Sequence, residues 1–194
     1  MLENIRKYNI LLGSKSPRRR ELLNQLRIPF TVVTIGGLEE TYPDTLRKEE
    51  IPQFLANQKA DAYLDSMHDN DMVITADTLV ILDDKVLGKP KDMPQAIAML
   101  MELSGKVHKV VSGVCISTKM KRVSFSSVTE VRFSNITEEE ARYYVENFLP
   151  LDKAGAYGIQ EWIGCVAVEW IEGSYYNVMG LPVNQLYREL KSFI

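Results

Sequence analysis

The 194-residue sequence predicts a mixed α/β fold in which helices flank a central sheet. Short apolar runs rich in β-branched residues, typical of buried strands, alternate with segments whose apolar residues recur at helical spacing. Two longer β-rich stretches, 107–118 and 122–133, are separated only by the short polar segment 119–121, which predicts an antiparallel hairpin. We therefore expect a mixed sheet.

Composition and charge exclude several classes of protein. Hydrophobic residues make up 45% of the chain and charged residues 25%, an ordinary mixture for one globular domain with a substantial core. The net charge of -3 provides no positive field to hold a nucleic-acid polymer. No apolar run is long enough to span a membrane, so neither a nucleic-acid polymer nor a membrane is an expected partner.

The scarce cysteines and histidines indicate the compartment and the kind of metal. Cys115 and Cys165 are the two cysteines, and the N-terminus does not resemble a signal peptide, so we expect a cytoplasmic protein with reduced thiols. His68 and His108 lie far apart in the sequence, which disfavours a histidine-rich zinc site. Any metal would then have oxygen ligands, as Mg²⁺ or Mn²⁺ does.

The first predicted strand and helix carry an unusual charge pattern. Residues 8–12 form a short apolar strand, Ser16 is a good helix N-cap and Pro17 suits the first helical position. Arginines then occupy positions 18–20, although a helix N-terminus disfavours cations. A phosphate bound by these arginines, Ser14 and the free backbone N–H groups would resolve the conflict, and a solvated basic patch is the alternative.

A second strand at 30–35 and a helix at 48–66 are expected next. Glu39 and Glu40, which follow the strand, are interpreted first as solvated loop residues and second as metal ligands or catalytic residues. Lys59 lies within the helix and, without other information, is expected to be an exposed helix lysine.

An acidic residue interrupts the most apolar strand. Residues 72–76 and 79–82 are both apolar, and Asp77 stands between them. A buried carboxylate needs a cation, a metal or a cleft wall, so a functional Asp77 is favoured over a structural one. Residues 79–87 predict a hairpin, and the following Gly88–Pro90 segment presents Lys89 from a restrained loop suited to phosphate.

The remaining elements continue the α/β pattern. A helix is expected at 93–103, and Thr137 with Glu140 predicts a capping box at the start of another helix. The rest of the chain is expected to form a loop at 150–160, a strand at 162–171, an aromatic and polar segment at 174–182 and a last helix at 183–193. The chain contains neither a P-loop nor a G-x-G-x-x-G motif, so phosphate would be bound in another way.

Six sequence blocks together resemble one protein family. Gly13–Arg19 followed by Glu21-Leu22-Leu23 is similar to the N-terminal signature of the Maf proteins. Five further blocks resemble that family in the family's order: Ala76–Thr78, Gly88–Pro90, Leu103–Gly105, Asp152–Gln160 and Gly180–Pro182. The resemblance covers nearly the whole chain.

This resemblance implies a nucleoside triphosphate pyrophosphatase that releases a nucleoside monophosphate and pyrophosphate with the help of Mg²⁺ or Mn²⁺. It further implies a single domain over 1–194, with two lobes around a cleft as in the inosine-triphosphate pyrophosphatases, and a cytoplasmic homodimer. The family was named for a link to septum formation, so a non-catalytic, nucleotide-binding regulator of cell division is the rival hypothesis.

The resemblance also implies roles for particular residues. Arg18, Thr78 and Gln160 match the subgroup that hydrolyses dTTP and UTP, whereas the subgroup acting on 7-methyl-GTP has other residues there. The Gln160 amide can both donate and accept, which suits O4 and N3–H of thymine or uracil. The same chemistry on 7-methyl-GTP or on purine nucleotides is the closer alternative.

The full set of implied roles is as follows. Asp77, as proton acceptor, acts with the cations Lys59 and Lys89. The substrate-binding residues are Ser14, Arg18, Arg19, Thr78 and Gln160, and the metal ligands are Glu39 and Asp77. Because the alignment is loose around Gly36-Gly37, Glu40 is an alternative to Glu39. Gly13 and Thr75 stand where the family more often has Ala and Gly.

Overall fold

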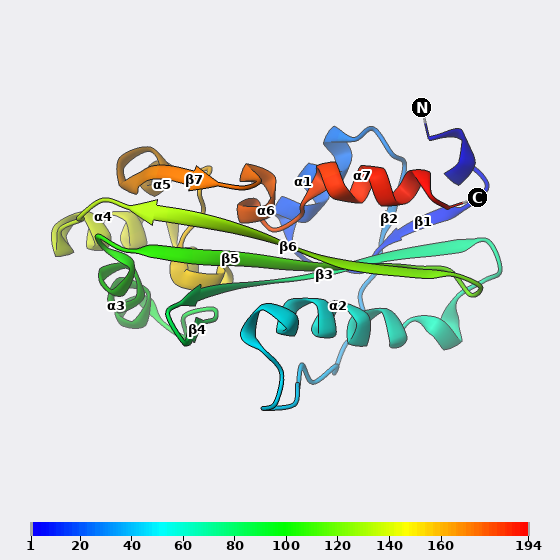
Figure 1. The fold of residues 1–194 in the computed structure, drawn as a ribbon, viewed down its shortest axis with the longest axis horizontal. Helices are drawn as coiled ribbons and strands as arrows, with labels where there is room; N and C mark the ends of the chain where they lie inside the picture. The colour runs from blue at the N-terminus through cyan, green and yellow to red at the C-terminus, as the bar shows by residue number, and fades with distance from the viewer. Residues whose placement is uncertain (1, 194) are drawn as a thin grey trace. The chain divides into compact units, whose positions relative to one another are not determined.

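A computed structural model describes residues 2–193 (Figure 1). Within these residues the strands form one seven-stranded sheet in the order β2-β1-β3-β5-β6-β7, with β4 paired to β3. Pairs β1–β2 and β1–β3 are parallel, whereas β3–β4 and β6–β7 are antiparallel. The expected mixed α/β fold with a mixed sheet is therefore confirmed.

The chain divides into two compact units. The first comprises residues 1–77, 112–127 and 180–194, and the second comprises residues 78–111 and 128–179. Strands β3 (Asp71–Leu82), β5 (Val107–Ser117) and β6 (Arg122–Phe133) each contribute residues to both. In the part of the chain that the structure describes, no helix is long and apolar enough to cross a membrane.

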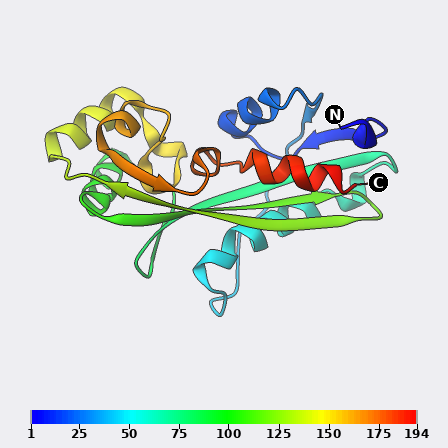
Figure 2. The same cartoon turned by 45° about the horizontal axis from the view of Figure 1, so that its top comes forward.

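The first unit is built around the parallel strands. Strand β1 (Asn9–Leu12) lies between β2 (Thr31–Val32) and the first half of β3. Helix α2 (Ile51–Asp61) covers one face of these strands, and the opposite face is covered by two helices, α1 (Pro17–Gln25) and α7 (Val183–Lys191) (Figures 1 and 2). The core between the layers includes Leu12, Leu22, Leu23, Ala56 and Ile74, all fully buried.

The second unit packs helices against the other halves of the long strands. Helix α3 (Met93–Leu103) lies against α4 (Glu138–Phe148). The other elements are β4 (Lys85–Leu87), α5 (Trp162–Ala167), β7 (Val168–Glu172) and α6 (Tyr175–Met179). The capping box predicted for α4 is confirmed, since Thr137 Oγ1 accepts from the Glu140 N–H and Glu140 Oε2 accepts from the Thr137 N–H.

Several expected elements differ from the observed ones. The strand expected at 162–171 is wrong over its first half, because Ile163 and Ala167 pack inward at helical spacing and form α5. The strand expected at 30–35 shrinks to β2, because β1 ends at Leu12, whose carbonyl accepts from the Val33 N–H at 3.0 Å. The helix expected at 48–66 is divided into a 3-10 turn, α2 and a second 3-10 turn at Leu64–Ser66.

Candidate functional site

Asp77, Lys59 and Glu40 form a charged cluster in the first unit. The Lys59 ammonium, on α2, lies 2.7 Å from Asp77 Oδ1 and 3.1 Å from Glu40 Oε1. The side chains of Asp77 and Lys59 are 12% and 15% exposed, whereas that of Glu40 is 50% exposed. Pairing with Lys59 explains how β3 accommodates a buried acid, because each charge offsets part of the other's desolvation. The expectation that Lys59 is an exposed helix lysine is wrong.

The second carboxylate oxygen of Asp77 has a different environment. Asp77 Oδ2 is buried and has no hydrogen-bond partner among residues 2–193. A buried acceptor without a donor is unfavourable by about 1–3 kcal/mol, so such an atom usually serves a ligand, an ion or a water molecule. The bond from Lys59 to Oδ1 fixes the carboxylate and leaves Oδ2 as the available acceptor.

The structure distinguishes the two neighbouring glutamates. It places Glu40, the alternative to Glu39, against Lys59. The adjacent side chain of α2 holds the same loop, since Gln58 Nε2 donates to the Thr41 carbonyl at 3.2 Å. No local pattern predicts this contact of Gln58, because its partner lies in a loop without secondary structure 17 residues earlier.

The turn between β1 and α1 has the geometry expected for a capped helix start. Ser16 Oγ accepts from the Arg19 N–H at 3.5 Å, and Ser14 Oγ accepts from the Ser16 N–H at 3.2 Å. Pro17 occupies the first turn of α1, as predicted. The side chain of Arg18 is on this turn and half-buried.

Arg19 binds protein atoms rather than extending into solvent. Its Nε donates to the Gly180 carbonyl at 2.9 Å, and its Nη1 donates to the Ala76 carbonyl at 2.8 Å and to Ser14 Oγ at 3.3 Å. Burial lowers the pKa of the Arg19 guanidinium, and the Asp77 carboxylate opposes this shift. Arg19 thus ties the turn to the carbonyl directly before Asp77. Its assignment to substrate stays a prediction.

The second unit carries the other predicted residues. Thr78 follows Asp77 in β3 and is half-buried. Lys89 is exposed on the loop after β4, and the Gly155 N–H donates to the Gly88 carbonyl at 3.1 Å, which connects this loop to the segment that ends at Gln160. Gln160 is exposed after a run of five buried residues.

The candidate residues are therefore divided between the units. The first unit contains Ser14, Arg18, Arg19, Glu39, Glu40, Lys59 and Asp77, and the second contains Thr78, Lys89 and Gln160. Among the described residues, no three His, Cys, Asp or Glu side chains converge as a metal site. Mg²⁺ at a nucleotide usually takes one or two carboxylates and completes its shell with phosphate oxygens and water, a pattern that Asp77 Oδ2 with a neighbouring carboxylate fits.

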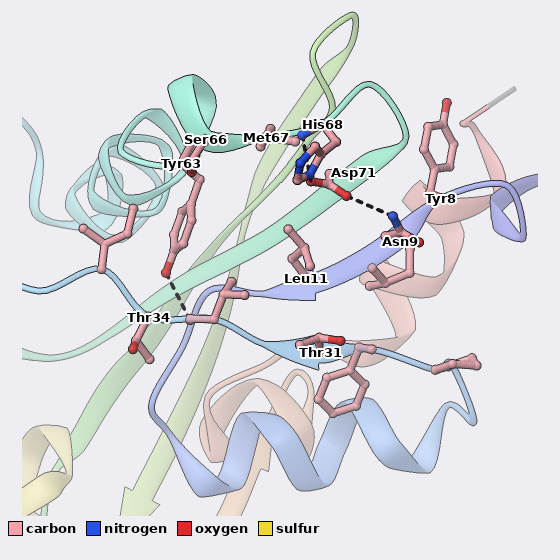
Figure 3. Close-up of a pocket in the computed structure, with 15 residues that line it drawn as sticks. Tyr8, Asn9, Leu11, Thr31, Thr34, Tyr63, Ser66, Met67, His68 and Asp71 are labelled. Carbon is pink, nitrogen blue, oxygen red and sulfur yellow. Dashed lines mark hydrogen bonds and ion pairs between the residues drawn. The ribbon is translucent and has the colours of Figure 1, made fainter.

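A separate groove of about 710 Å³ lies beside the parallel strands of the first unit (Figure 3). Tyr8, Asn9 and Asp71 line it near the N-terminal ends of β1 and β3. Asp71 accepts hydrogen bonds from Asn9 Nδ2 at 3.2 Å and from the His68 backbone N–H at 2.8 Å. None of the predicted site residues is among those that line this groove.

Comparison with curated proteins shows strong similarity over the whole chain. A protein of Phocaeicola vulgatus called dTTP/UTP pyrophosphatase is 56% identical over 191 residues, covering 98% of this chain and 99% of that protein. A protein of Parabacteroides distasonis with the same name is 53% identical over 193 residues and covers both chains fully. A third, from Porphyromonas gingivalis W83, is 51% identical over 195 residues, covering 100% of this chain and 98% of that protein.

Solved structures support the fold, and a family model identifies the family. The Staphylococcus aureus Ham1 protein aligns with a TM-score of 0.57 and 16% identity over 95% of this chain and 98% of that one. A Coxiella burnetii HAM1 protein aligns with a TM-score of 0.51 and 15% identity over 95% and 99%. The model of the Maf-like proteins matches residues 9–193, so the resemblance inferred from six sequence blocks is confirmed, and the chain belongs to the Maf-like protein family.

Proposed function

We propose that this chain is a nucleoside triphosphate pyrophosphatase that hydrolyses dTTP and UTP to the nucleoside monophosphate and pyrophosphate. The observation that carries the proposal is the Asp77 carboxylate, which Lys59 fixes through Oδ1 while Oδ2 stays buried and available. The shared name of the three relatives supports the substrate class. On the family resemblance we also propose a cytoplasmic homodimer, which sedimentation velocity tests.

In this mechanism Asp77 Oδ2 accepts a proton from the attacking water. The water oxygen forms a bond to the α-phosphorus, and the bond between that phosphorus and the α,β-bridging oxygen breaks. The electron pair of the broken bond leaves with pyrophosphate. Lys59 holds the carboxylate in one orientation, which supports a role for Asp77 as the general base.

Positive groups bind the triphosphate. Arg18, on the first turn of α1, supplies a guanidinium suited to phosphate oxygens. Lys89 supplies a further cation. Gln160 reads the edge of the base with its amide, and Thr78 contributes a hydroxyl.

A divalent cation fits the first unit. The carboxylates of Asp77 and Glu40 would hold Mg²⁺ or Mn²⁺, because carboxylate oxygens are the ligands that these ions prefer. A bound cation would neutralise phosphate charge and make a coordinated water more acidic.

Replacement of Asp77 tests the proposal. Asp77→Asn keeps the size of the side chain and removes the base, so pyrophosphate release should fall by about 10²–10⁴-fold while the far-ultraviolet circular dichroism is unchanged. Asp65→Asn, at an exposed position of the same unit, is the control and should retain activity. If the Asp77→Asn variant turns over substrate at the wild-type rate, Asp77 is not the base.

A substrate panel separates the proposal from its rivals. It comprises dTTP, UTP, CTP, 7-methyl-GTP and ITP, each with Mg²⁺ or Mn²⁺. Preference for dTTP and UTP is expected, and Gln160→Glu should shift that preference. Activity confined to 7-methyl-GTP or purine nucleotides would support pyrophosphate release as the reaction but would reject dTTP and UTP as the substrates. Tight nucleotide binding without any turnover would favour the regulator.

A further inference from the structure

We propose that Tyr144 and Glu161 are positioning residues that set base preference by orienting the Gln160 amide. The inference rests on the proposed function, in which Gln160 reads the base. It is independent of the catalytic cluster, because Tyr144, Glu161 and Gln160 all belong to the second unit.

The buried hydroxyl of Tyr144 hydrogen-bonds to a residue before Gln160 and to the residue after it. Tyr144 lies on α4 with none of its surface exposed. Its hydroxyl donates to Glu161 Oε2 and accepts from the Gly158 N–H at 3.0 Å. The Glu161 N–H also donates to the Gly158 carbonyl at 3.0 Å, which closes a turn over residues 158–161. Gln160 is therefore an exposed residue within a turn, and the first and last residues of that turn both hydrogen-bond to the Tyr144 hydroxyl.

The second oxygen of Glu161 is engaged as well. Glu161 Oε1 lies 3.2 Å from Lys153 Nζ, and the same ammonium donates to Asp152 Oδ1 at 2.9 Å. The side chains of Lys153 and Glu161 are 9% and 20% exposed, so solvent screens this pair only weakly. The Glu161 carboxylate is thus fixed by Tyr144 on one oxygen and by Lys153 on the other.

The fixed carboxylate lies close to the Gln160 side chain. A β-carbon added at Gly158 would lie 3.0 Å from the Glu161 carboxyl group and 3.1 Å from Gln160 Nε2. The Gln160 amide therefore lies over Gly158 and on the same side of the turn as the carboxylate. A movement of Glu161 changes the electrostatic surroundings of the amide, and with them the preferred placement of its donor and acceptor ends.

Adjacent tyrosines on α4 provide a matched test. Tyr144→Phe removes only the hydroxyl, whereas Tyr143→Phe removes a hydroxyl from a side chain that is half exposed and packs edge-on against Trp162. Loss of a buried hydrogen bond corresponds to about tenfold in an equilibrium. Tyr144→Phe should reduce the ratio of kcat/KM for dTTP to that for CTP by about this factor, mainly through KM for dTTP. Tyr143→Phe should leave the ratio unchanged.

Variants at Glu161 separate positioning from general stabilisation. Glu161→Ala should lower the same ratio as Tyr144→Phe does. Glu161→Gln keeps an oxygen that accepts from Tyr144 and should restore much of the preference, although it loses the ion pair with Lys153. The midpoint of thermal unfolding is measured for each variant and for the wild type. If Tyr144 and Glu161 served stability alone, their replacement would lower this midpoint and would reduce kcat/KM for dTTP and CTP equally.

A third position keeps the inference testable if the Tyr144 variant fails to fold. Gly158→Ala introduces a methyl group against the Gln160 amide and the Glu161 carboxylate, which are side-chain rather than backbone atoms. It should lower the dTTP to CTP ratio without unfolding the unit. An unchanged ratio in Glu161→Ala and Gly158→Ala would overturn the inference. Absence of turnover by the wild type would instead reject the proposed function.

Discussion

Of the two neighbouring glutamates, Glu40 is the one that contacts Lys59. Glu40 Oε1 lies 3.1 Å from Lys59, so Glu40→Gln removes a negative charge from the cluster that includes Asp77. We expect Glu40→Gln to raise the Mg²⁺ concentration needed for half-maximal activity by about tenfold, the usual scale for groups that support a metal site. A Mg²⁺ titration of pyrophosphate release measures this. Glu39→Gln is the control, and a larger effect of that variant would restore the assignment to Glu39.

Gly13 and Thr75 fit each other sterically. A β-carbon at Gly13 would lie 2.9 Å from Thr75 Cγ2 and 2.9 Å from Tyr63 Cε2. Gly13→Ala should therefore destabilise the fold by about 1–3 kcal/mol. Thr75→Ser removes that methyl group but keeps the hydroxyl that donates to the Ala56 carbonyl at 2.6 Å. In the Thr75→Ser background the penalty of Gly13→Ala should shrink, as urea unfolding of the four proteins measures. Additive penalties would contradict this coupling.

At the scale of single residues, one anomaly in the sequence predicted part of the candidate site. An acid within an apolar strand drew attention to Asp77, and the observed ion pair with Lys59 agrees with the rule that a buried carboxylate needs a partner. The sequence did not decide between Glu39 and Glu40, because their distance from Lys59 depends on the path of the intervening loop.

At the scale of elements, α2 approaches β5 at one glycine. A β-carbon at Gly113 would lie 2.1 Å from the Gln53 nitrogen and 2.2 Å from the Pro52 carbonyl carbon. Because both are backbone atoms, the helix would have to move away from the strand. Gly113→Ala should cost about 3 kcal/mol or more in the free energy of unfolding.

Another glycine supplies the control for this measurement. A β-carbon at Gly36 would meet nothing within 4 Å, and Gly36 lacks the left-handed backbone that disfavours alanine. Gly36→Ala should be neutral or slightly stabilising in the same denaturant titration. Equal effects of Gly36→Ala and Gly113→Ala would show that the helix is not packed on the strand as the structure indicates.

The sequence predicted most accurately those helices and strands whose periodicity or residue propensities are strong. Helix α3 and strand β6 have the bounds that periodicity and β-propensity indicated. Helix α5 was missed because Trp162, Ile163 and Val166 favour strands, and only the tertiary position of its buried face makes this segment helical.

At the scale of the whole molecule, a buried histidine makes folding sensitive to acid. His108 is 2% exposed, and its Nε2 lies 2.7 Å from the Tyr157 hydroxyl. Burial lowers the pKa of His108 to about 4 from 6.5. Between these values the unfolded chain binds a proton that the folded chain does not, so stability should fall as pH falls from 6.5 to 4. The loss by pH 4 is about 3 kcal/mol.

Replacement of His108 tests this acid sensitivity. His108→Gln should flatten the decline in stability between pH 6.5 and 4, whatever its effect at pH 7. His68→Gln, at a side chain that is 85% exposed, should leave the slope unchanged. Urea unfolding at several pH values gives both slopes. An unchanged slope in His108→Gln would show that other groups cause the acid sensitivity.

The sequence was sufficient for the family, the mixed α/β class, the cap of α4 and the unusual Asp77, because each depends on residue types within short segments. Only the tertiary structure showed that Lys59 is buried against Asp77, that Arg19 binds backbone carbonyls and that Tyr144 anchors the Gln160 turn. These contacts join residues that lie 14 to 161 positions apart. Contacts between residues so far apart in the sequence depend on how whole helices and strands pack, which no local sequence pattern specifies.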